Sequence, residues 1–307
     1  MPESPEVQAL ADELDERLRG RALTDVDVIE FRVVKTRARQ PATLVGARVS
    51  GVARHGKLFD VGFAGGAAGG GAHLVVSLGR HGWARWADGD GAVATPATDA
   101  SAPDTPTTDA STEPPPPTLA TLAFDDGAVL ELTDAGSWVS LGLSAVDDPA
   151  EVPAVGKLGP DPADPGFTRA AFDAAVAGRR KQVKAVLQDQ ESLAGIGNAY
   201  SDEILHRAKV SPVGHAAALT AGEADRLFDA TVGVITDAIH AQRGIPIDRL
   251  KAAKVASMRA HGRAGEPCPV CGDTIRDFSF ASTTAQYCPT CQTGGAVLLL
   301  RGDGGDR

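Results

Sequence analysis

The chain has 307 residues, 43% of them hydrophobic and 23% charged, and its formal net charge at pH 7 is −10. This length is enough for two domains with hydrophobic cores and one small additional module. The sequence contains neither an apolar run long enough to cross a membrane nor the basic start and apolar segment of a signal peptide. We therefore expect a cytoplasmic monomer with no membrane partner.

The acidic residues are unevenly distributed along the chain. Residues 88–113 contain six Asp or Glu and no Lys or Arg, whereas residues 250–301 contain six Lys or Arg and three Asp or Glu. A net negative charge argues against nucleic acid as a partner only when the charges are evenly spread. The basic C-terminal region keeps a nucleic-acid partner open.

The chain begins Met1-Pro2-Glu3-Ser4-Pro5-Glu6. A small residue after the initiator methionine allows that methionine to be removed, which would leave the secondary amine of Pro2 as the N-terminus. Because α-amino groups titrate near about 7.7–8.0, a useful fraction of such an amine is uncharged and nucleophilic at cellular pH. Glu3 could supply the proton that attack on a carbon requires. The alternative is a stiff, polar terminus without chemistry.

The first half of the chain predicts one helix followed by β structure. Apolar residues recur at helical spacing between Pro5 and Leu23. Four alternating or β-branched runs then predict strands of an antiparallel β structure, and they cover 24–34, 48–63, 72–86 and 121–132. A glycine-rich turn is expected at 64–71. The Pro-, Ala- and Asp-rich segment 88–117 predicts a disordered insertion.

The second half of the chain predicts helices and then a small metal module. Helical spacing appears in 172–187, 200–207 and 223–242, after a Pro- and Gly-rich stretch at 158–166. We therefore expect an N-terminal domain over 1–150, a helical domain over 151–257 and a cysteine module over 258–301, in an α+β multidomain chain.

The four cysteines form two C-x2-C pairs separated by sixteen residues, and they are Cys268, Cys271, Cys288 and Cys291. This spacing is typical of one structural zinc site, in which four thiolates leave no open coordination position for catalysis. Bound iron or two disulfides are the competing interpretations.

Three further segments predict contacts with an anion. Lys57 lies at a predicted turn before a strand, although it also suits an ordinary exposed lysine. Gly195-Ile196-Gly197 precedes a predicted helix, and backbone N–H groups at such a start can bind phosphate, but an ordinary helix-turn-helix hairpin fits equally well. The basic stretch 259–267 leads into the first cysteine pair and suits a nucleic-acid backbone.

Together these motifs resemble the formamidopyrimidine-DNA glycosylase/endonuclease VIII family of bifunctional base-excision-repair enzymes. The resemblance covers nearly the whole chain apart from the insertion, and it extends to the segments 158–162, 189–190, 194–200 and 203–205. It implies an N-terminal β-sandwich with flanking helices, a helix-two-turn-helix domain, a C-terminal zinc finger with one structural Zn²⁺, and damaged DNA as the partner. It also implies a bacterial enzyme that is associated with the nucleoid when bound to DNA.

The resemblance assigns roles to individual residues. Pro2 becomes the nucleophile that forms a Schiff base with C1′ of the damaged nucleotide, Glu3 the general acid/base, and Lys57 a phosphate ligand in the catalytic set. Asn198 and Gly197 would bind the neighbouring phosphate. The strand would break by β- and δ-elimination after the nucleotide has left the base stack.

The sequence departs from the family pattern at three DNA-contacting positions. Thr283 stands where the zinc hairpin usually has an arginine, with Arg276 and Arg263 as the nearby cations; a threonine hydroxyl cannot bind phosphate bidentately. Ser137 replaces the arginine that reads the opposite base, while Trp138 keeps an aromatic wedge. Arg80 stands at a methionine position and is a candidate substitute for the missing arginine.

These changes predict weak discrimination of the opposite base, activity on single-stranded or bubble DNA, and a preference for oxidised pyrimidines over 8-oxoguanine. Two rival functions stay open on the sequence. One is a non-catalytic or lyase-weak DNA-binding paralogue with altered lesion recognition. The other is an RNA-associated zinc-ribbon protein, which leaves Pro2-Glu3 unexplained.

Overall fold

The computed structural model describes residues 1–65, 71–87, 115–280 and 283–298. The expected glycine-rich turn therefore lies largely outside the described residues, and the predicted insertion lies almost wholly outside them. Among the described residues no helix is long and apolar enough to cross a membrane.

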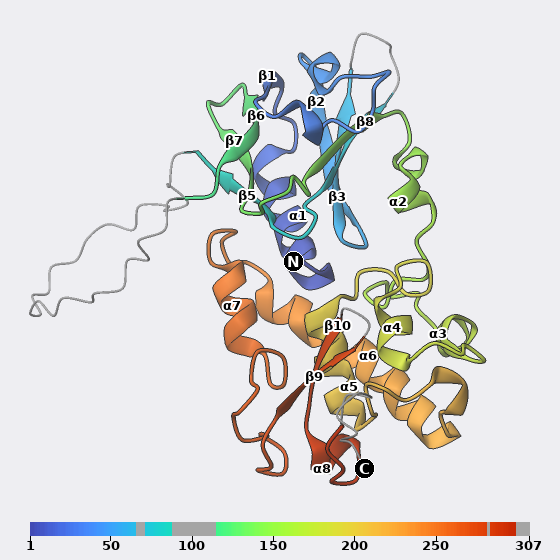
Figure 1. Ribbon diagram of the computed structural model, residues 1–307. Coiled ribbons are helices and arrows are strands. Elements are labelled where there is room, and N and C mark those ends of the chain that lie inside the picture. Colours follow the sequence, from blue (N-terminus) through green and yellow to red (C-terminus); the bar gives the residue numbers. More distant parts are fainter. Residues whose placement is uncertain (66–70, 88–114, 281–282, 299–307) are drawn as a thin grey trace, which may run out of the picture.

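Two four-stranded antiparallel sheets and one long helix form the N-terminal half (Figure 1). The helix is α1 (Ser4–Leu18). The first sheet has the order β1-β6-β7-β5, with β1 (Leu23–Val28), β6 (Thr118–Phe124), β7 (Val129–Asp134) and β5 (Gly82–Trp86). The second has the order β2-β3-β4-β8, with β2 (Arg48–His55), β3 (Leu58–Ala64), β4 (Ala72–Ser77) and β8 (Gly142–Val146).

One hydrophobic core joins the two sheets and α1. Its residues include Leu10 and Leu14 of α1, Phe59 of β3 and Leu132 of β7, and all are almost fully buried. Burial of this apolar surface is the main force that holds the half together. The predicted β-sandwich with flanking helix is confirmed.

The predicted boundaries need five corrections. Helix α1 ends at Leu18 because the chain turns at Gly20, whose φ is +81°, to reach β1. The run 24–34 leaves its strand after Val28. Each of the runs 48–63, 72–86 and 121–132 is two strands, and the middle run changes sheet between β4 and β5.

The C-terminal half is helical. Its helices are α2 (Pro153–Gly156), α3 (Arg169–Val176), α4 (Val183–Gln188), α5 (Asn198–Ala208), α6 (Ala221–Gln242) and α7 (Leu250–Ser257). A second hydrophobic cluster lies among α3 to α6 and includes Phe172, Ile204 and Leu227. Short 3₁₀ turns lie at Phe31–Val33, Pro41–Leu44, Pro149–Glu151 and Ala216–Ala218.

The cysteine module packs on α5. It consists of the hairpin β9 (Arg276–Phe280) and β10 (Thr283–Tyr287) and the short helix α8 (Pro289–Gln292). The basic stretch 259–267 forms turns, and its backbone N–H groups at Arg259, Ala260 and His261 donate to the buried carboxylate of Glu203.

The segment between α6 and α7 anchors the two halves to each other. Ile247 and Leu250 are buried in the core of the N-terminal half. The indole of Trp83 donates to the Ile247 carbonyl at 2.9 Å, and Ile247 N–H donates to Glu13 at 2.9 Å. A further ion pair joins Arg54 of β2 to Asp161 at 2.6 Å. The halves are therefore fixed to each other at two places, the α6–α7 connection and the Arg54–Asp161 ion pair.

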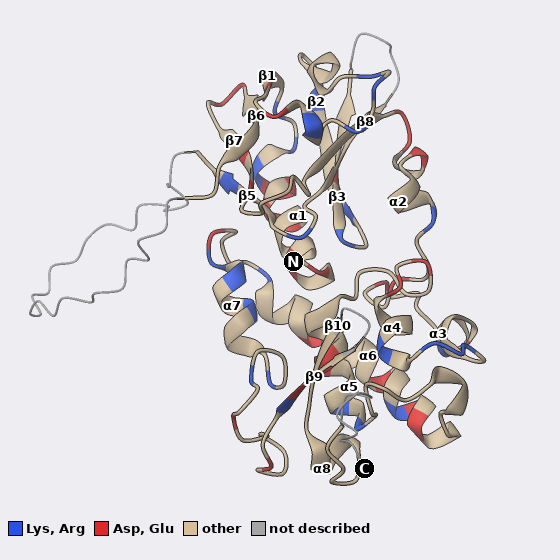
Figure 2. Ribbon diagram, viewed as in Figure 1, with Lys and Arg blue, Asp and Glu red and all other residues tan. Residues whose placement is uncertain are grey.

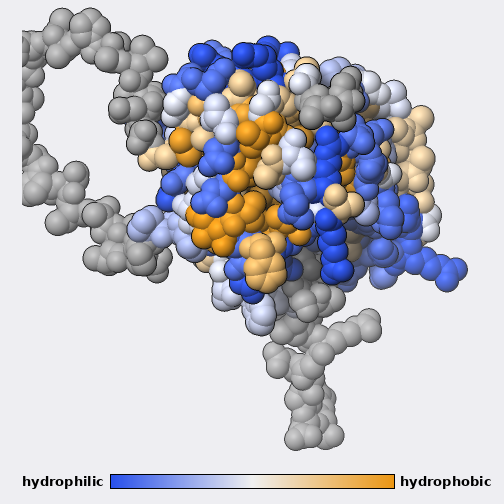
Figure 3. All heavy atoms as spheres, turned by 90° about the horizontal axis from the view of Figure 1, so that it is seen from above, coloured by the Kyte–Doolittle hydropathy of each residue, from blue (hydrophilic) through white to orange (hydrophobic). Residues whose placement is uncertain are grey.

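Apolar side chains are also exposed at the far end of the N-terminal half. Figure 3 views the molecule from above Figure 1 and shows hydrophobic residues gathered among hydrophilic ones on this face. The large exposed apolar residues of this half include Ile29, Phe31 and Val45, which are 59%, 80% and 43% exposed.

Candidate active site

The N-terminus lies against the first turn of α5. Glu3 is the N-cap of α1, and the next residue, Ser4, donates its N–H to the carbonyl of Gly195 at 3.0 Å. The Glu3 carboxylate accepts hydrogen bonds from the backbone N–H groups of Gly197, Ala199 and Tyr200. Two motifs nearly 200 residues apart in sequence thus form one site.

Two glycines permit this close approach. A Cβ added at Gly197 would lie 2.6 Å from Cδ of Glu3, and a Cβ at Gly195 would lie 1.8 Å from Oγ of Ser4. Gly195 also has φ of +85°, a conformation that side-chain-bearing residues rarely adopt. The glycine pair of the motif is therefore required by packing against Glu3 and Ser4.

The expected anion site at the start of α5 is filled by the protein itself. A helix start attracts negative charge because its first N–H groups have no partner within the helix. Here that charge is the Glu3 carboxylate, so the N–H groups of Gly197, Ala199 and Tyr200 are already engaged. The Asn198 side chain is exposed, and its Oδ1 accepts from Gln188 at 3.0 Å.

A cavity of 570 Å³ opens beside these residues. Pro2 and Glu3 lie in its wall together with Asn198 and Arg80, so the structure brings four of the predicted site residues to one place. Pro2 is buried, whereas Met1 is 57% exposed. Loss of Met1 would open the Pro2 nitrogen to this cavity.

Lys57 lies in the turn between β2 and β3, as predicted, and lines an adjoining cavity of 440 Å³. Arg80 lines both cavities, and Lys157 lines the second. Basic residues of this turn and of α7 flank the N-terminus in Figure 2. The wall around the N-terminus is therefore cationic, as a phosphate backbone requires.

The electrostatics keep Glu3 ionised. Burial alone would raise the pKa of Glu3, but Lys254, Lys57 and the N–H groups of Ala199 and Gly197 together lower it. Burial lowers the pKa of Lys57, against the attraction of Glu3. The site thus holds a carboxylate and not a carboxylic acid before substrate arrives.

Arg80 and Trp138 lie on two loops in contact. The Arg80 N–H donates to Ser140 Oγ at 3.1 Å, and Ala135 N–H donates to the His81 carbonyl at 3.3 Å. The Trp138 side chain is 81% exposed. The structure therefore places Arg80 on a loop that touches the one carrying Trp138, whose wedge role stays a prediction.

Arg263 and Arg276 do not line either cavity. The Arg263 guanidinium donates to the carbonyls of Met258 at 3.1 Å and Val255 at 3.2 Å, so it caps the end of α7. Arg276 is exposed at the start of β9. Their predicted contacts with DNA stay predictions.

The four cysteine sulfurs converge. All lie within 4.8 Å of one another, with 4.0 Å between Cys268 and Cys291 and 3.3 Å between Cys271 and Cys288. Tetrahedral coordination at about 2.3 Å places sulfurs about 3.8 Å apart, so this arrangement fits one zinc ion. The Asp273 carboxylate accepts from both N–H and Oγ of Thr290 and so ties the two C-x2-C turns together.

Several residues around the N-terminus were not predicted as site residues. Lys251 and Lys254 of α7 line the 570 Å³ cavity, and so does Glu6. Buried Lys184 pairs with Asp202, whose other oxygen contacts His261 at 2.8 Å. Nothing in the local sequence distinguishes these lysines from surface lysines, because their partners lie far away along the chain.

Comparison with known proteins places these motifs in one family. The sequence model of the formamidopyrimidine-DNA glycosylase N-terminal domain matches residues 1–138, that of the H2TH domain of the same enzymes residues 158–248, and that of the zinc finger found in FPG and IleRS residues 265–294. The formamidopyrimidine-DNA glycosylase of Mycobacterium sp. (strain KMS) is 32% identical over 95% of this chain and 97% of its own length. The chain belongs to the formamidopyrimidine-DNA glycosylase family. It is thereby a DNA glycosylase of base-excision repair, and the predicted family is confirmed.

Other members of the formamidopyrimidine-DNA glycosylase family support the assignment. An uncharacterized formamidopyrimidine-DNA glycosylase-like protein of Mycobacterium tuberculosis is 47% identical over 47% of this chain and 90% of that protein. The crystal structure of the MutM (Fpg) protein from Thermus thermophilus has 28% identity and a TM-score of 0.73, and it covers 95% of this chain and 98% of that chain. Lactococcus lactis Fpg bound to DNA containing N7-benzyl-Fapy-dG has 24% identity and a TM-score of 0.76 over 95% and 100%, and it shares the fold.

Proposed function

We propose that this glycosylase is bifunctional: it removes an oxidised base from damaged DNA and then cleaves the strand as an AP lyase. The observation that carries the proposal is the burial of Pro2 beside the ionised Glu3 carboxylate, in the wall of a cavity that cations surround. A secondary amine next to a held carboxylate suits covalent attack on a sugar carbon with proton transfer.

The proposed reaction starts after removal of Met1. The Pro2 nitrogen attacks C1′ of the damaged nucleotide, the N-glycosidic bond breaks, and the base leaves with its bonding pair. The Glu3 carboxylate takes the proton of the attacking amine and returns it to O4′ as the sugar ring opens. The product is a positively charged Schiff base between Pro2 and C1′.

Strand cleavage follows from the charge of this iminium. It acidifies the C2′ hydrogen, whose loss expels the phosphate from C3′, and a second proton loss at C4′ expels the phosphate from C5′. Water finally releases the sugar fragment and regenerates the amine. Lys57 and Asn198 are proposed to bind phosphates beside the lesion, since both carry polar groups at the mouth of the two cavities.

The target nucleotide must leave the duplex for Pro2 to reach C1′. Trp138 and Arg80 are proposed to fill the gap, because they lie on exposed loops that contact each other beside the 570 Å³ cavity. Without an arginine at Ser137, we expect little dependence on the opposite base and a preference for oxidised pyrimidines. One structural zinc ion, held by the four cysteines, would fix the hairpin, and the protein would act as a monomer.

Borohydride reduction tests the covalent step. With a duplex that contains one abasic site, the mature protein should form a stable protein–DNA adduct, and peptide mapping should place the adduct on Pro2. A preparation whose N-terminus is blocked by an uncleaved tag should form none. Binding without any adduct would instead support the non-catalytic DNA-binding alternative.

Glu3→Gln separates the two chemical steps. Excision of an oxidised base should fall strongly, because the ring-opening proton is lost. Adduct formation with an abasic site should persist, because the abasic sugar already opens to an aldehyde in solution. A panel of oxidised bases in single- and double-stranded DNA, with each opposite base, would measure the substrate preference; strong preference for 8-oxoguanine opposite cytosine would overturn it.

A further inference from the structure

Lys254 of α7 contacts both carboxylates of the N-terminal segment. Its Nζ lies 2.7 Å from Oε2 of Glu6 and 3.5 Å from Oε1 of Glu3. The Lys254 side chain is 13% exposed, while those of Glu3 and Glu6 are 2% and 1% exposed. A buried ammonium between two buried carboxylates interacts far more strongly than an exposed pair.

The same ammonium also approaches the nucleophile. Lys254 Nζ lies 3.3 Å from the carbonyl oxygen of Met1, and the Pro2 nitrogen is bonded to that carbonyl carbon. Removal of Met1 therefore leaves the Pro2 amine within a few ångströms of Lys254, on the side where the 570 Å³ cavity opens.

A hydrogen-bond network fixes the position of this group. The Tyr200 hydroxyl donates to Oε1 of Glu6 at 2.8 Å, and Gln242 Nε2 donates to the same oxygen at 2.9 Å. Lys254 Nζ sits 4.9 Å from the centroid of the Tyr200 ring. Burial and the nearby Glu6 carboxylate raise the pKa of Tyr200, so its hydroxyl stays a donor.

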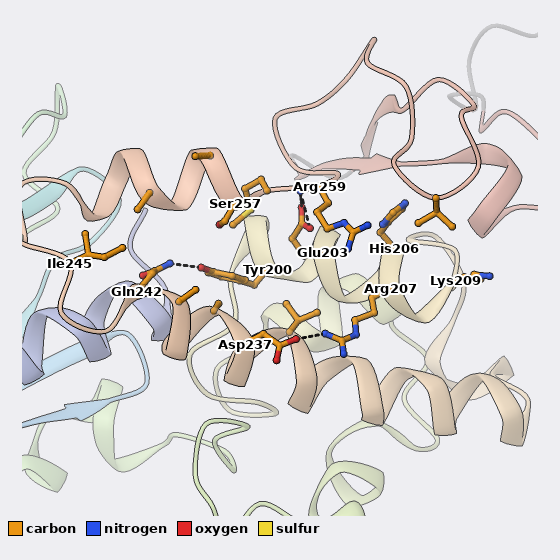
Figure 4. Close-up of a pocket in the computed structure, with 17 residues that line it drawn as sticks. Tyr200, Glu203, His206, Arg207, Lys209, Asp237, Gln242, Ile245, Ser257 and Arg259 are labelled. Atoms are coloured by element: carbon orange, nitrogen blue, oxygen red, sulfur yellow. Dashed lines mark hydrogen bonds and ion pairs between the residues drawn. The ribbon is translucent and has the colours of Figure 1, made fainter.

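A second cavity borders this hydrogen-bond network. Tyr200 and Gln242 lie at one end of a separate cavity of 920 Å³ between α5, α6 and α7, where Gln242 and Tyr200 are joined by a hydrogen bond (Figure 4). Met258 lines both this cavity and the 570 Å³ cavity. Glu6 is therefore held from behind by side chains of α5 and α6, and Lys254 is held by Glu6.

The charge of Lys254 acts in the same direction on Glu3 and on the terminal amine of Met1, which lies one residue before the Pro2 nitrogen. After burial, Lys254 is the largest cause that lowers the pKa of the Met1 amine, and it is the largest of the interactions that lower the pKa of Glu3. Burial would lower the pKa of Lys254 itself, but Glu3 and Glu6 raise it, so Lys254 stays charged and is a poor nucleophile.

We propose that Lys254 is a positioning residue, whose ammonium orients Glu3 beside the Pro2 nitrogen and keeps both groups unprotonated until substrate arrives. The inference rests on the proposed lyase function. It assigns to Lys254 no contact with the reacting carbon and no proton transfer. Its role is to fix the charge state and the geometry of the two groups that do react.

The other charged groups around this site set the expected direction of change. Lys254 faces Glu3 and Glu6, the amine of Met1, Tyr200 of α5 and Lys57. Nearby, Lys184 interacts with Glu3 and Lys251 with the Met1 amine. Without the Lys254 ammonium, the negative charges of Glu3 and Glu6 are less well neutralised, so protonation of Glu3 and of the Pro2 amine becomes easier. Because the unprotonated forms react, activity should then require a higher pH.

Lys254→Met tests this with single-turnover excision measured across pH. An opposite charge at this range changes a carboxylate pKa by about 1–3 units, so the acidic limb of the profile should move up by about one pH unit. The rate at pH 7 should fall about tenfold or more, while the Kd for a duplex with a tetrahydrofuran abasic analogue stays within about threefold. Lys254→Arg keeps the charge and should return the limb towards that of the wild type.

Glu6→Gln should shift the pH profile of excision in the opposite direction. This variant tests the inference even if Lys254→Met does not fold. It removes a negative charge that raises the pKa of the Met1 amine and that stays beside the Pro2 amine once Met1 is lost, so the acidic limb should move to lower pH. Lys181→Met removes one exposed lysine, 62% exposed and paired with Asp189, and should leave the profile unchanged.

The outcomes separate this inference from the proposed function. If wild-type protein forms no borohydride adduct on Pro2, the proposed function fails. If wild-type protein forms the adduct but Lys254→Met keeps the wild-type pH profile, or Lys254→Arg and Lys254→Met shift it alike, the role of Lys254 is wrong. A Lys254→Met protein whose only defect is weaker DNA binding also overturns it.

Discussion

The Gly197→Ala substitution should displace the Glu3 carboxylate by a distance that follows from the structure. The added Cβ would lie 2.6 Å from Cδ of Glu3, whereas ordinary contacts begin near 3.4 Å, so Glu3 must shift by about 0.8 Å. The φ of Gly197 is −125°, which alanine adopts without strain. The perturbation is therefore confined to the contact between residue 197 and Glu3.

This shift predicts a selective loss of base excision. It weakens the hydrogen bonds that Glu3 accepts from Gly197 and Ala199, and a bond to a charged group contributes about 1.5–3 kcal/mol. A reacting group misplaced by about 1 Å costs about 100-fold in rate. We expect excision to fall about 10- to 100-fold, and borohydride trapping on an abasic duplex to fall less than about threefold.

Single-turnover excision from a fluorescent duplex with one oxidised pyrimidine measures the effect. Gly222→Ala is the matched control, since its added Cβ meets nothing closer than 3.7 Å, at Nη1 of Arg226. Circular dichroism confirms that both variants are folded at the assay temperature. Wild-type excision by Gly197→Ala, or an equal loss of excision and trapping, would refute the reasoning.

Three further predictions concern the metal, the buried ion pair and the DNA surface. Denaturation with a thiol reagent and a zinc indicator should release one zinc per chain, and Cys288→Ser should release none; iron in metal analysis would contradict this. Lys184→Met leaves Asp202 buried without its lysine and should lower the free energy of unfolding by about 3–5 kcal/mol in urea titration, with partial recovery when Asp202→Leu is added. Arg80→Ala should reduce both affinity for the lesion duplex and excision from it, and unchanged values would contradict the proposed role of Arg80 in filling the gap.

The sequence predicted those parts of the site that local chemistry determines. Two C-x2-C pairs at this spacing specify a four-thiolate cluster whatever surrounds them, and the structure brings the four sulfurs together. Pro2-Glu3 and the glycines at 195 and 197 were also recognisable, because each residue type is needed for its own backbone or chemistry.

The missed elements lack the periodicity on which prediction depends. Strand β8 is buried along its whole length, so it has no alternation of polar and apolar residues. Helix α7 has eight residues and buries only Leu250, so it is too short to show a repeated apolar spacing. The role of Lys254 could not be predicted at all, since its partners lie about 250 positions away in sequence.

The anchoring of Ile247 and Leu250 in the β core bears on how the enzyme meets its substrate. Trp83 and Glu13 bind the α6–α7 connection, and Arg54 binds Asp161 at a second place. The two halves therefore have little freedom to rotate relative to each other. If the proposed function is correct, the protein stays rigid during binding, and the DNA duplex undergoes the bending and strand distortion. Lesions that already weaken stacking would then be the easiest to admit.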